Sequence, residues 1–200
     1  MGTRHLIAVQ KDGEYKVAQY GQWDGYPSGQ GLSVLNNINS QAKRKRLING
    51  LEKVRFLDPK GEDKEFLELY EKNTPTWSSE PDNRTEEQKH WFSTYISRDL
   101  GADILYNISH SKDNEIILDN SLSFAGESLF CEFAYVIDFD KETLEVFEGF
   151  NKEPILNGRF TSEEFKKDAK WEPVVLVKEY SFRNLPNEAQ FLEDLEKEEE

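Results

Sequence analysis

The chain has 200 residues, of which 36% are hydrophobic and 32% are charged, and its formal net charge is −14. No apolar run approaches the roughly 18 residues that a membrane span needs. The start of the chain lacks the long apolar segment of a signal peptide. Because Cys131 is the only cysteine, no internal disulfide can form, and a reducing, cytoplasmic location is expected.

The negative charge is unevenly distributed along the chain. Lys and Arg balance Asp and Glu in residues 1–100, so the whole excess lies in residues 101–200. This half is expected to repel nucleic acid and anionic membranes, and neither is a predicted partner. It could instead bind a basic protein or mimic the charge of DNA. An acidic surface that only keeps the protein soluble is the simpler interpretation.

The first predicted unit is a hairpin. Residues 5–10 form an apolar strand, Lys11-Asp12-Gly13 is a turn signal because Asp-Gly suits positive φ, and residues 14–20 return as the second strand. Alternation along that second strand places Tyr15, Val17 and Gln19 on one face.

A glycine-rich and aromatic segment, QYGQWDGYPSGQG at 19–31, follows the hairpin and holds four of the twelve glycines. Glycine lets a backbone approach a ligand closely, and Trp and Tyr offer flat apolar faces with a polar tip. The segment therefore predicts the wall of a ligand pocket, although a tight connector whose rings plug the core edge is an equally good interpretation. The candidate ligand-binding residues are Arg4, Tyr20, Gln22, Trp23, Asp24, Tyr26, Ser28, Gly29, Gln30 and Gly31.

The helix expected to begin at Leu32 suggests what this pocket would bind. A helix start behind a glycine-rich loop exposes amide groups and favours anions, and Arg4 and Lys16 add positive charge nearby in the chain. Trp23 and the two tyrosines would stack on an aromatic part of the ligand, and Asp24 would accept its hydrogen bonds. The pattern matches neither a Walker loop nor a dinucleotide fingerprint.

The middle of the chain is predicted to be mainly helical. A helix is expected at 41–54, with the basic run 43–46 as a solvated face that is too short to indicate nucleic-acid binding. Another helix is expected at 62–72, and 73–84 is an ordered loop in which Trp77 covers part of the protein. Thr85 and Gln88 form a capping box for a helix that reaches about Asp99 and ends at Gly101. Periodicity does not decide whether 102–109 is helix or strand.

The remaining segments complete the predicted fold. Strands are expected at 115–118, 130–138, 143–149 and 174–182, and Glu145 is placed on a solvent-facing side of the sheet. Residues 161–164 are expected to cap the start of a short helix, and another helix is expected at 187–196, with a frayed acidic tail at 196–200. We expect one α+β domain over residues 1–200, with about five mainly antiparallel strands and helices packed on one face.

Two segments resemble a family of uncharacterised proteins from bacteria, phages and some fungi. They are GTRHLI at 2–7 with YKVAQYGQWDGYPSGQG at 15–31, and SLFCEFAYVID at 128–138. The resemblance implies that both segments belong to one fold, but it implies no activity, cofactor or catalytic residue. A phage setting would imply a counter-defence role in the host cytoplasm, such as sequestering a nucleotide signal or blocking a host protein.

Catalytic and metal-binding signals are weak. No zinc motif is present, the three histidines are far apart, and neither a metal nor a cofactor is expected. An N-terminal-nucleophile-like hydrolase would need Thr3 exposed by unusual trimming, because position 2 is glycine. The spacing of Ser28, His5 and Asp24 does not support a catalytic Ser–His–acid arrangement. Cys131 is expected to be a buried, inert residue.

The leading hypothesis is therefore a non-catalytic binding protein for a small anionic molecule such as a nucleotide. The alternatives are an acidic inhibitor that binds a basic protein or mimics DNA, and the hydrolase.

Overall fold

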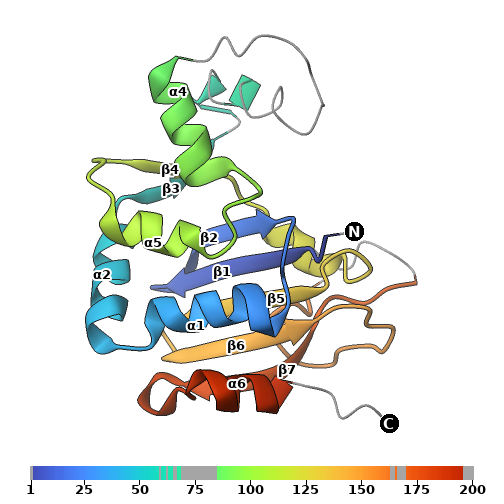
Figure 1. Ribbon diagram of the computed structural model, residues 1–200. Helices are drawn as coiled ribbons and strands as arrows, with labels where there is room; N and C mark the ends of the chain where they lie inside the picture. Colours follow the sequence, from blue (N-terminus) through green and yellow to red (C-terminus); the bar gives the residue numbers. More distant parts are fainter. Residues whose placement is uncertain are drawn as a thin grey trace.

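A five-stranded sheet forms the centre of the protein in the computed structural model, which describes residues 2–58, 60–61, 63–64, 67–68, 85–162, 165 and 170–195 (Figure 1). Its strand order is β2–β1–β5–β6–β7, with the bounds β1 His5–Lys11, β2 Glu14–Gly21, β5 Phe133–Asp138, β6 Thr143–Glu148 and β7 Val175–Ser181. Every neighbouring pair is antiparallel except β1 and β5, which run parallel. The predicted α+β class with about five mainly antiparallel strands is confirmed.

The N-terminal hairpin forms as predicted, with one difference in its register. Asp12 and Gly13 have φ values of 57° and 77°, the left-handed pair that a two-residue hairpin turn requires. Val9 pairs with Val17 whereas Gln10 pairs with Tyr15, so one extra residue is inserted in β2. This bulge turns Tyr15 toward the face opposite Val17. The prediction that Tyr15 shares a face with Val17 is therefore wrong.

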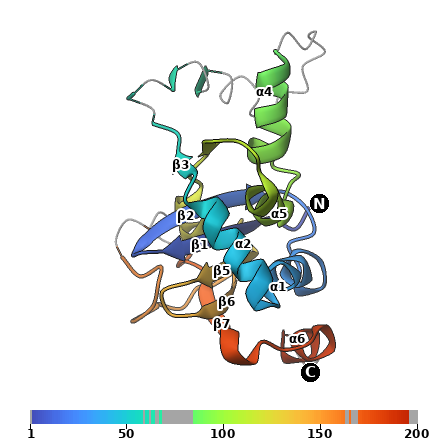
Figure 2. The same ribbon diagram turned by 90° about the vertical axis from the view of Figure 1, so that its left-hand side faces the viewer.

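One face of the sheet is covered by helices α1 (Leu32–Ile38), α2 (Gln41–Leu51), α5 (Asp103–His110) and α6 (Glu188–Leu195), as Figures 1 and 2 show. Burial of apolar surface between these two layers supplies most of the core. The main buried contacts join Ile7, Val9, Val17, Tyr135, Ile137, Leu144 and Val146 of the strands to Val34, Leu35, Ile38, Leu47, Leu51, Ile104, Leu105, Ile108 and Phe191 of the helices.

The other face of the sheet is covered by loop segments rather than by helices (Figure 2). The short helical turn η3 (Leu122–Gly126) and the chain after β6 provide this second layer. Its core comprises Leu6, Ala8, Ala134, Val136 and Phe147 of the strands with Ala125, Cys131, Phe160, Phe165 and Val174 of the loops. Both faces of the sheet are therefore buried over much of their area.

Two predicted helices end earlier than expected. Helix α2 stops at Leu51, and Val54–Phe56 forms strand β3, which pairs parallel with β4 (Ile116–Leu118) in a separate two-stranded sheet. Helix α4 (Glu86–Trp91) continues as the π-helical turn η2 (Phe92–Ile96) and ends before Asp99. Gly101, with φ of 50°, lies instead in the turn that leads into α5.

Other boundaries follow local hydrogen bonding. The capping box of α4 is confirmed, because the Gln88 amide donates to the Thr85 hydroxyl at 3.2 Å and the Thr85 amide donates to the Gln88 side chain at 2.9 Å. The strand predicted from 130 begins only at Phe133, since the amides of Phe130 and Cys131 donate to the Glu127 carbonyl in a turn.

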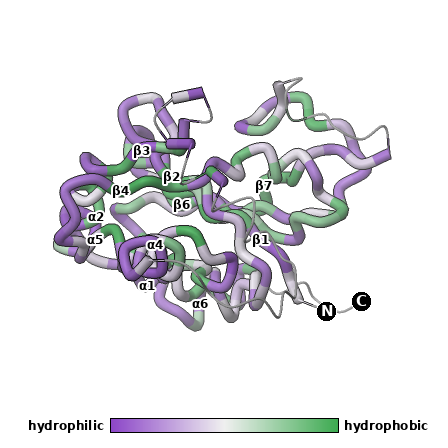
Figure 3. The backbone as a smooth tube through the Cα atoms, turned by 90° about the horizontal axis from the view of Figure 1, so that it is seen from above, coloured by the Kyte–Doolittle hydropathy of each residue, from purple (hydrophilic) through white to green (hydrophobic). Residues whose placement is uncertain are grey.

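Four predicted segments lie wholly or partly outside the described residues. They are the helix at 62–72, the loop at 73–84 with Trp77, the short helix capped by 161–164, and the tail at 196–200. Within the described residues, no helix combines the length and the apolar character needed to cross a membrane. Figure 3 shows that most of α2 is hydrophilic whereas β4 is hydrophobic.

Candidate functional site

The glycine-rich loop at 19–31 is bound firmly to the start of the sheet. The Gly25 amide donates to the Thr3 carbonyl at 3.0 Å, and the buried Tyr135 hydroxyl donates to the Gly25 carbonyl at 2.8 Å. Gln22 donates its amide to the Arg98 carbonyl at 3.0 Å. The loop thus joins the residues just before β1 and the middle of β5 to the segment that precedes α5.

The amides that were expected to hold an anion already have partners inside the loop. Gly29 and Gly31 donate to the Tyr26 carbonyl at 3.0 and 3.2 Å, and Gln30 donates to the Asp24 carbonyl at 2.9 Å. These bonds form the π-helical turn η1 (Pro27–Gly31), which runs directly into α1. An anion would reach these amides only if η1 opened.

Close packing accounts for the glycines of the loop. A Cβ at Gly21 would collide with the imidazole of His5, its partner across the hairpin. A Cβ at Gly31 would lie 2.9 Å from the Tyr135 hydroxyl and 3.0 Å from its ring. These contacts support the interpretation of the segment as a tight connector, since glycine is required where backbone and side chain approach so closely.

The candidate side chains of the loop divide into two groups. Trp23, Asp24, Tyr26 and Ser28 are exposed, with Trp23 47% and Tyr26 51% accessible. The others support the structure: the Tyr20 hydroxyl donates to Gln22 at 2.6 Å, and the Gln30 side chain accepts from the Ala102 amide at 2.7 Å.

Even the exposed group is partly engaged in packing, and Arg4 lies apart from it. The Trp23 indole donates to Asp99 at 2.8 Å, while the Arg4 guanidinium lies over the ring of Phe130, 4.8 Å from its centroid. The exposed rings remain available to a ligand, and binding by the ten candidate residues stays a prediction.

The residues considered for catalysis are buried or unconnected. Thr3 and Cys131 are buried, and burial raises the pKa of the Cys131 thiol. Burial lowers the pKa of His5 to about 4, although the Thr3 backbone and Asp24 act in the opposite direction. In the described part of the chain, no hydrogen bond joins His5, Ser28 and Asp24, and no group of three or more His, Cys, Asp or Glu residues lies close enough to hold a metal ion.

The prediction that Glu145 lies on a solvent-facing side of the sheet is wrong. Glu145 is only 2% exposed, and its two carboxylate oxygens each accept from Arg159 at 2.7 Å. The loop that carries Arg159 covers this side of the sheet. Glu145 is therefore excluded as part of a surface for a basic partner, and the nearby Glu142 has an ion pair with Arg183 at 3.8 Å. A basic partner for the rest of residues 101–200 stays a prediction.

The basic run on α2 has a structural role at its first two positions. Lys43 donates to the Asn36 carbonyl and Arg44 to the Ile38 carbonyl, both at 2.6 Å. Cations at the end of a helix satisfy its last carbonyls and favour its dipole, so these residues stabilise the end of α1. The side chain of Lys45, by contrast, has no hydrogen bond or ion pair with any described residue.

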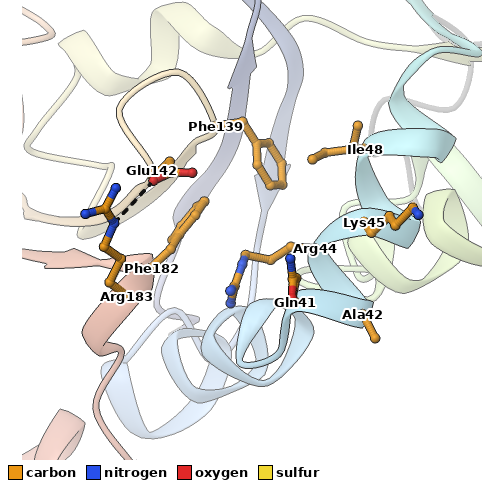
Figure 4. Close-up of a pocket in the computed structure, with 9 residues that line it drawn as sticks. All are labelled: Gln41, Ala42, Arg44, Lys45, Ile48, Phe139, Glu142, Phe182 and Arg183. Carbon is orange, nitrogen blue, oxygen red and sulfur yellow. Dashed lines mark ion pairs between the residues drawn. The ribbon is translucent and has the colours of Figure 1, made fainter.

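A groove of about 780 Å³ lies between α2 and the ends of three strands (Figure 4). We call it the α2 groove; its lining residues are Gln41, Ala42, Arg44, Lys45, Ile48, Phe139, Glu142, Phe182 and Arg183. Phe139 and Phe182 meet edge to face with their centroids 5.6 Å apart, and the Arg44 guanidinium lies 5.1 Å from the Phe182 centroid. The lining therefore combines three cations and one carboxylate with two aromatic rings, and Figure 4 shows Arg44 beside the rings while the Lys45 side chain points away from them.

Sheet topology explains why the sequence alone did not reveal this groove. Asp138 pairs with Thr143 and Thr143 with Ser181, so the residues that follow β5 and β7 lie at one end of the sheet. The Phe182 amide donates to the Glu142 carbonyl at 2.8 Å and fixes this arrangement. The only local signal was the basic run at 43–46, which by itself fits an ordinary solvated helix face.

Comparisons of the chain with protein-family models, with curated proteins and with solved structures gave no match. The resemblance of residues 2–31 and 128–138 to an uncharacterised family therefore stays a prediction.

Proposed function

We propose that the protein binds a small anionic ligand with an aromatic part, such as a nucleotide, in the α2 groove. The observation that supports this most directly is the meeting of Arg44, Lys45 and Arg183 with the rings of Phe139 and Phe182 in one open groove. Its volume falls in the range of about 300–1,000 Å³ typical of small-molecule sites.

The local charge of the α2 groove differs from the net charge of the whole protein. The net charge of −14 disfavours anions overall, whereas the groove has more cations than carboxylates. Arg44 is already fixed by its bond to α1 and by its contact with Phe182, so binding would order few additional side chains. Lys45 would gain a partner without losing one among the described residues. Binding of this kind would suit a protein that sequesters a nucleotide signal.

Calorimetric titration tests the proposal with three ligands that separate its two parts. AMP has both a ring and a phosphate, adenosine has only the ring system with its sugar, and ribose 5-phosphate has only the anion. We expect AMP to bind measurably tighter than either fragment. Failure of AMP, ADP and ATP to bind folded protein would show that the proposed function is wrong.

Single substitutions test whether AMP binds in the α2 groove. Lys45→Ala should weaken AMP binding about two- to fivefold, the value of one exposed charge pair, and Phe182→Leu should weaken it at least about fivefold through loss of stacking. Lys16→Ala is the matched control, because it removes the same charge from β2, where Lys16 pairs with Glu14. Thermal melts confirm folding of each variant.

The same titration separates the α2 groove from the loop at 19–31. Trp23→Ala removes an exposed ring of the loop and should leave AMP binding unchanged. If Trp23→Ala abolishes binding while Lys45→Ala and Phe182→Leu do not, the ligand binds at the glycine-rich loop and the α2 groove is the wrong site.

A further inference from the structure

A second groove, of about 290 Å³, lies on the opposite flank of α2. We call it the Tyr106 groove; Lys43, Arg46, Tyr106 and His110 are among its lining residues. The Tyr106 ring is 56% exposed and stacks on the His110 ring, with centroids 4.0 Å apart and planes at 24°. This groove repeats the combination found in the α2 groove, namely cations beside an exposed aromatic face.

Hydrogen bonds hold this second aromatic platform in place. The His110 Nδ1 atom lies 2.9 Å from the Tyr106 carbonyl, and because a carbonyl only accepts, Nδ1–H is the donor. The Nε2 atom is then free to accept from the Arg46 guanidinium at 3.0 Å. Arg46, His110 and Tyr106 therefore form one fixed array that presents the outer face of Tyr106 to solvent.

The helical geometry of α2 connects the two grooves. At about 100° per residue, Gln41, Arg44, Lys45 and Ile48 point to one flank, and Lys43 and Arg46 point to the other. Between them lies an exposed ridge whose centre is Ala42, with Lys45 and Arg46 on either side. A helix with its side chains is about 10–12 Å wide, so a ligand that reaches both grooves must be longer than one nucleotide.

We propose that the two grooves together bind one short single-stranded oligonucleotide, which crosses α2 over Ala42. One base stacks at Phe139 and Phe182, another stacks on Tyr106, and the phosphates between them lie along Lys45 and Arg46. This inference rests on the proposed function and specifies its ligand class. Aromatic platforms separated by a cationic path are the usual means of holding single strands without reading their sequence.

The acidic remainder of the surface determines the size of the ligand. Nucleic acid was not expected as a partner, because residues 101–200 are strongly acidic. The negative excess lies in residues 101–200, so phosphates that extend from α2 toward those residues meet repulsion. A duplex, with phosphates on two strands, would be repelled more than a short single strand. The ligand is therefore a short oligonucleotide rather than a long nucleic acid.

Fluorescence anisotropy with a length series tests this inference. Labelled oligoadenylates from mononucleotide upward are titrated with the full chain, and a labelled duplex serves as a comparison. We expect affinity to rise about tenfold or more once a second base reaches Tyr106, to level off with further length, and to be lowest for the duplex. Equal affinity for all lengths, or tighter binding of the duplex, would overturn the inference.

Tyr106→Ala separates this inference from the proposed function. It should remove the gain with length and leave mononucleotide binding unchanged, because Tyr106 does not line the α2 groove. Ala42→Glu places a carboxylate on the exposed ridge and at the edge of the α2 groove, so it should weaken the binding of both mononucleotides and longer oligonucleotides. Lys16→Ala is again the control for charge. If mononucleotides bind but Tyr106→Ala has no effect at any length, the proposed function stands and the two-groove inference is wrong; if no nucleotide binds, both are wrong.

Discussion

At the scale of single residues, Tyr135 shows how one side chain fixes the glycine-rich loop. It lies in the middle of β5, is fully buried, and donates its hydroxyl hydrogen to the Gly25 carbonyl at 2.8 Å. Its ring also occupies the space that a side chain at position 31 would need. Burial raises the pKa of Tyr135 well above its ordinary value, so the hydroxyl remains a donor at neutral pH.

We therefore expect Tyr135→Phe to reduce the free energy of unfolding by about 1–3 kcal/mol, because the Gly25 carbonyl is left without its partner. Urea denaturation measures this change. Tyr26→Phe, which alters an exposed tyrosine of the same loop, should stay within about 0.5 kcal/mol of the unmodified protein. Equal stability of the two variants would show that the bond to Gly25 contributes nothing.

At the scale of structural elements, Arg159 holds the loop layer on the sheet. Its side chain is 7% exposed and forms ion pairs with Asp138 of β5 and Glu145 of β6, and it also donates to Gln10 of β1. Burial would raise the pKa of Asp138, but the hydrogen bonds from Arg159 and from the amides of Lys141 and Asp140 outweigh it and hold the pKa below its ordinary value. Arg159 also donates to the Tyr15 hydroxyl of β2 at 3.2 Å, so four neighbouring strands share one cation.

This cluster predicts a pH-dependent effect of Arg159→Met. At neutral pH two buried carboxylates lose their partner, and breaking a buried pair in this way costs about 3–5 kcal/mol. Because the folded pKa of Asp138 is depressed, the stability it contributes is present above the unfolded pKa of about 3.9 and is lost as pH falls through the folded value. The difference between variant and unmodified protein should therefore shrink on acidification.

Thermal melts at neutral pH and at about pH 2, below the unfolded pKa, measure this difference. Arg159→Lys provides a comparison that keeps the charge but loses the planar, forked geometry of the guanidinium. A deficit of Arg159→Met that does not change with pH would contradict an electrostatic role for the cluster.

At the scale of the whole molecule, strands and helices from distant parts of the chain share one core. β1 lies between β2 and β5, so His5 faces both Gly21 and Phe133. The helical layer combines α1 and α2 from the first part of the chain with α6 from the last. Among the described residues, the core therefore joins the first and last parts of the chain.

We therefore expect residues 1–200 to unfold as one cooperative unit. Calorimetry should give a single transition whose calorimetric and van't Hoff enthalpies agree. Far-UV circular dichroism and tryptophan fluorescence should report the same midpoint. Two resolved transitions would contradict the prediction of one domain.

The sequence by itself determined those features that depend on neighbouring residues. Asp12-Gly13 specified the first hairpin, Thr85 and Gln88 specified the start of α4, and the glycine-rich segment was recognised as a special loop followed by a helix at Leu32. Turn geometry, capping and strand alternation operate over a few residues, so they can be read along the chain. The class of the fold follows from the order of such elements.

Only the tertiary structure decided which side chains are buried and which surfaces meet. Alternation placed Glu145 in solvent, but Arg159, fourteen positions later, allows it to be buried as an ion pair. Val54 was predicted in a helix, but in the structure it lies in β3 because it pairs with Ile116 of β4. The α2 groove likewise needs the ends of β5 and β7 beside a basic helix. These outcomes depend on partners far along the chain, and local periodicity contains no information about such partners.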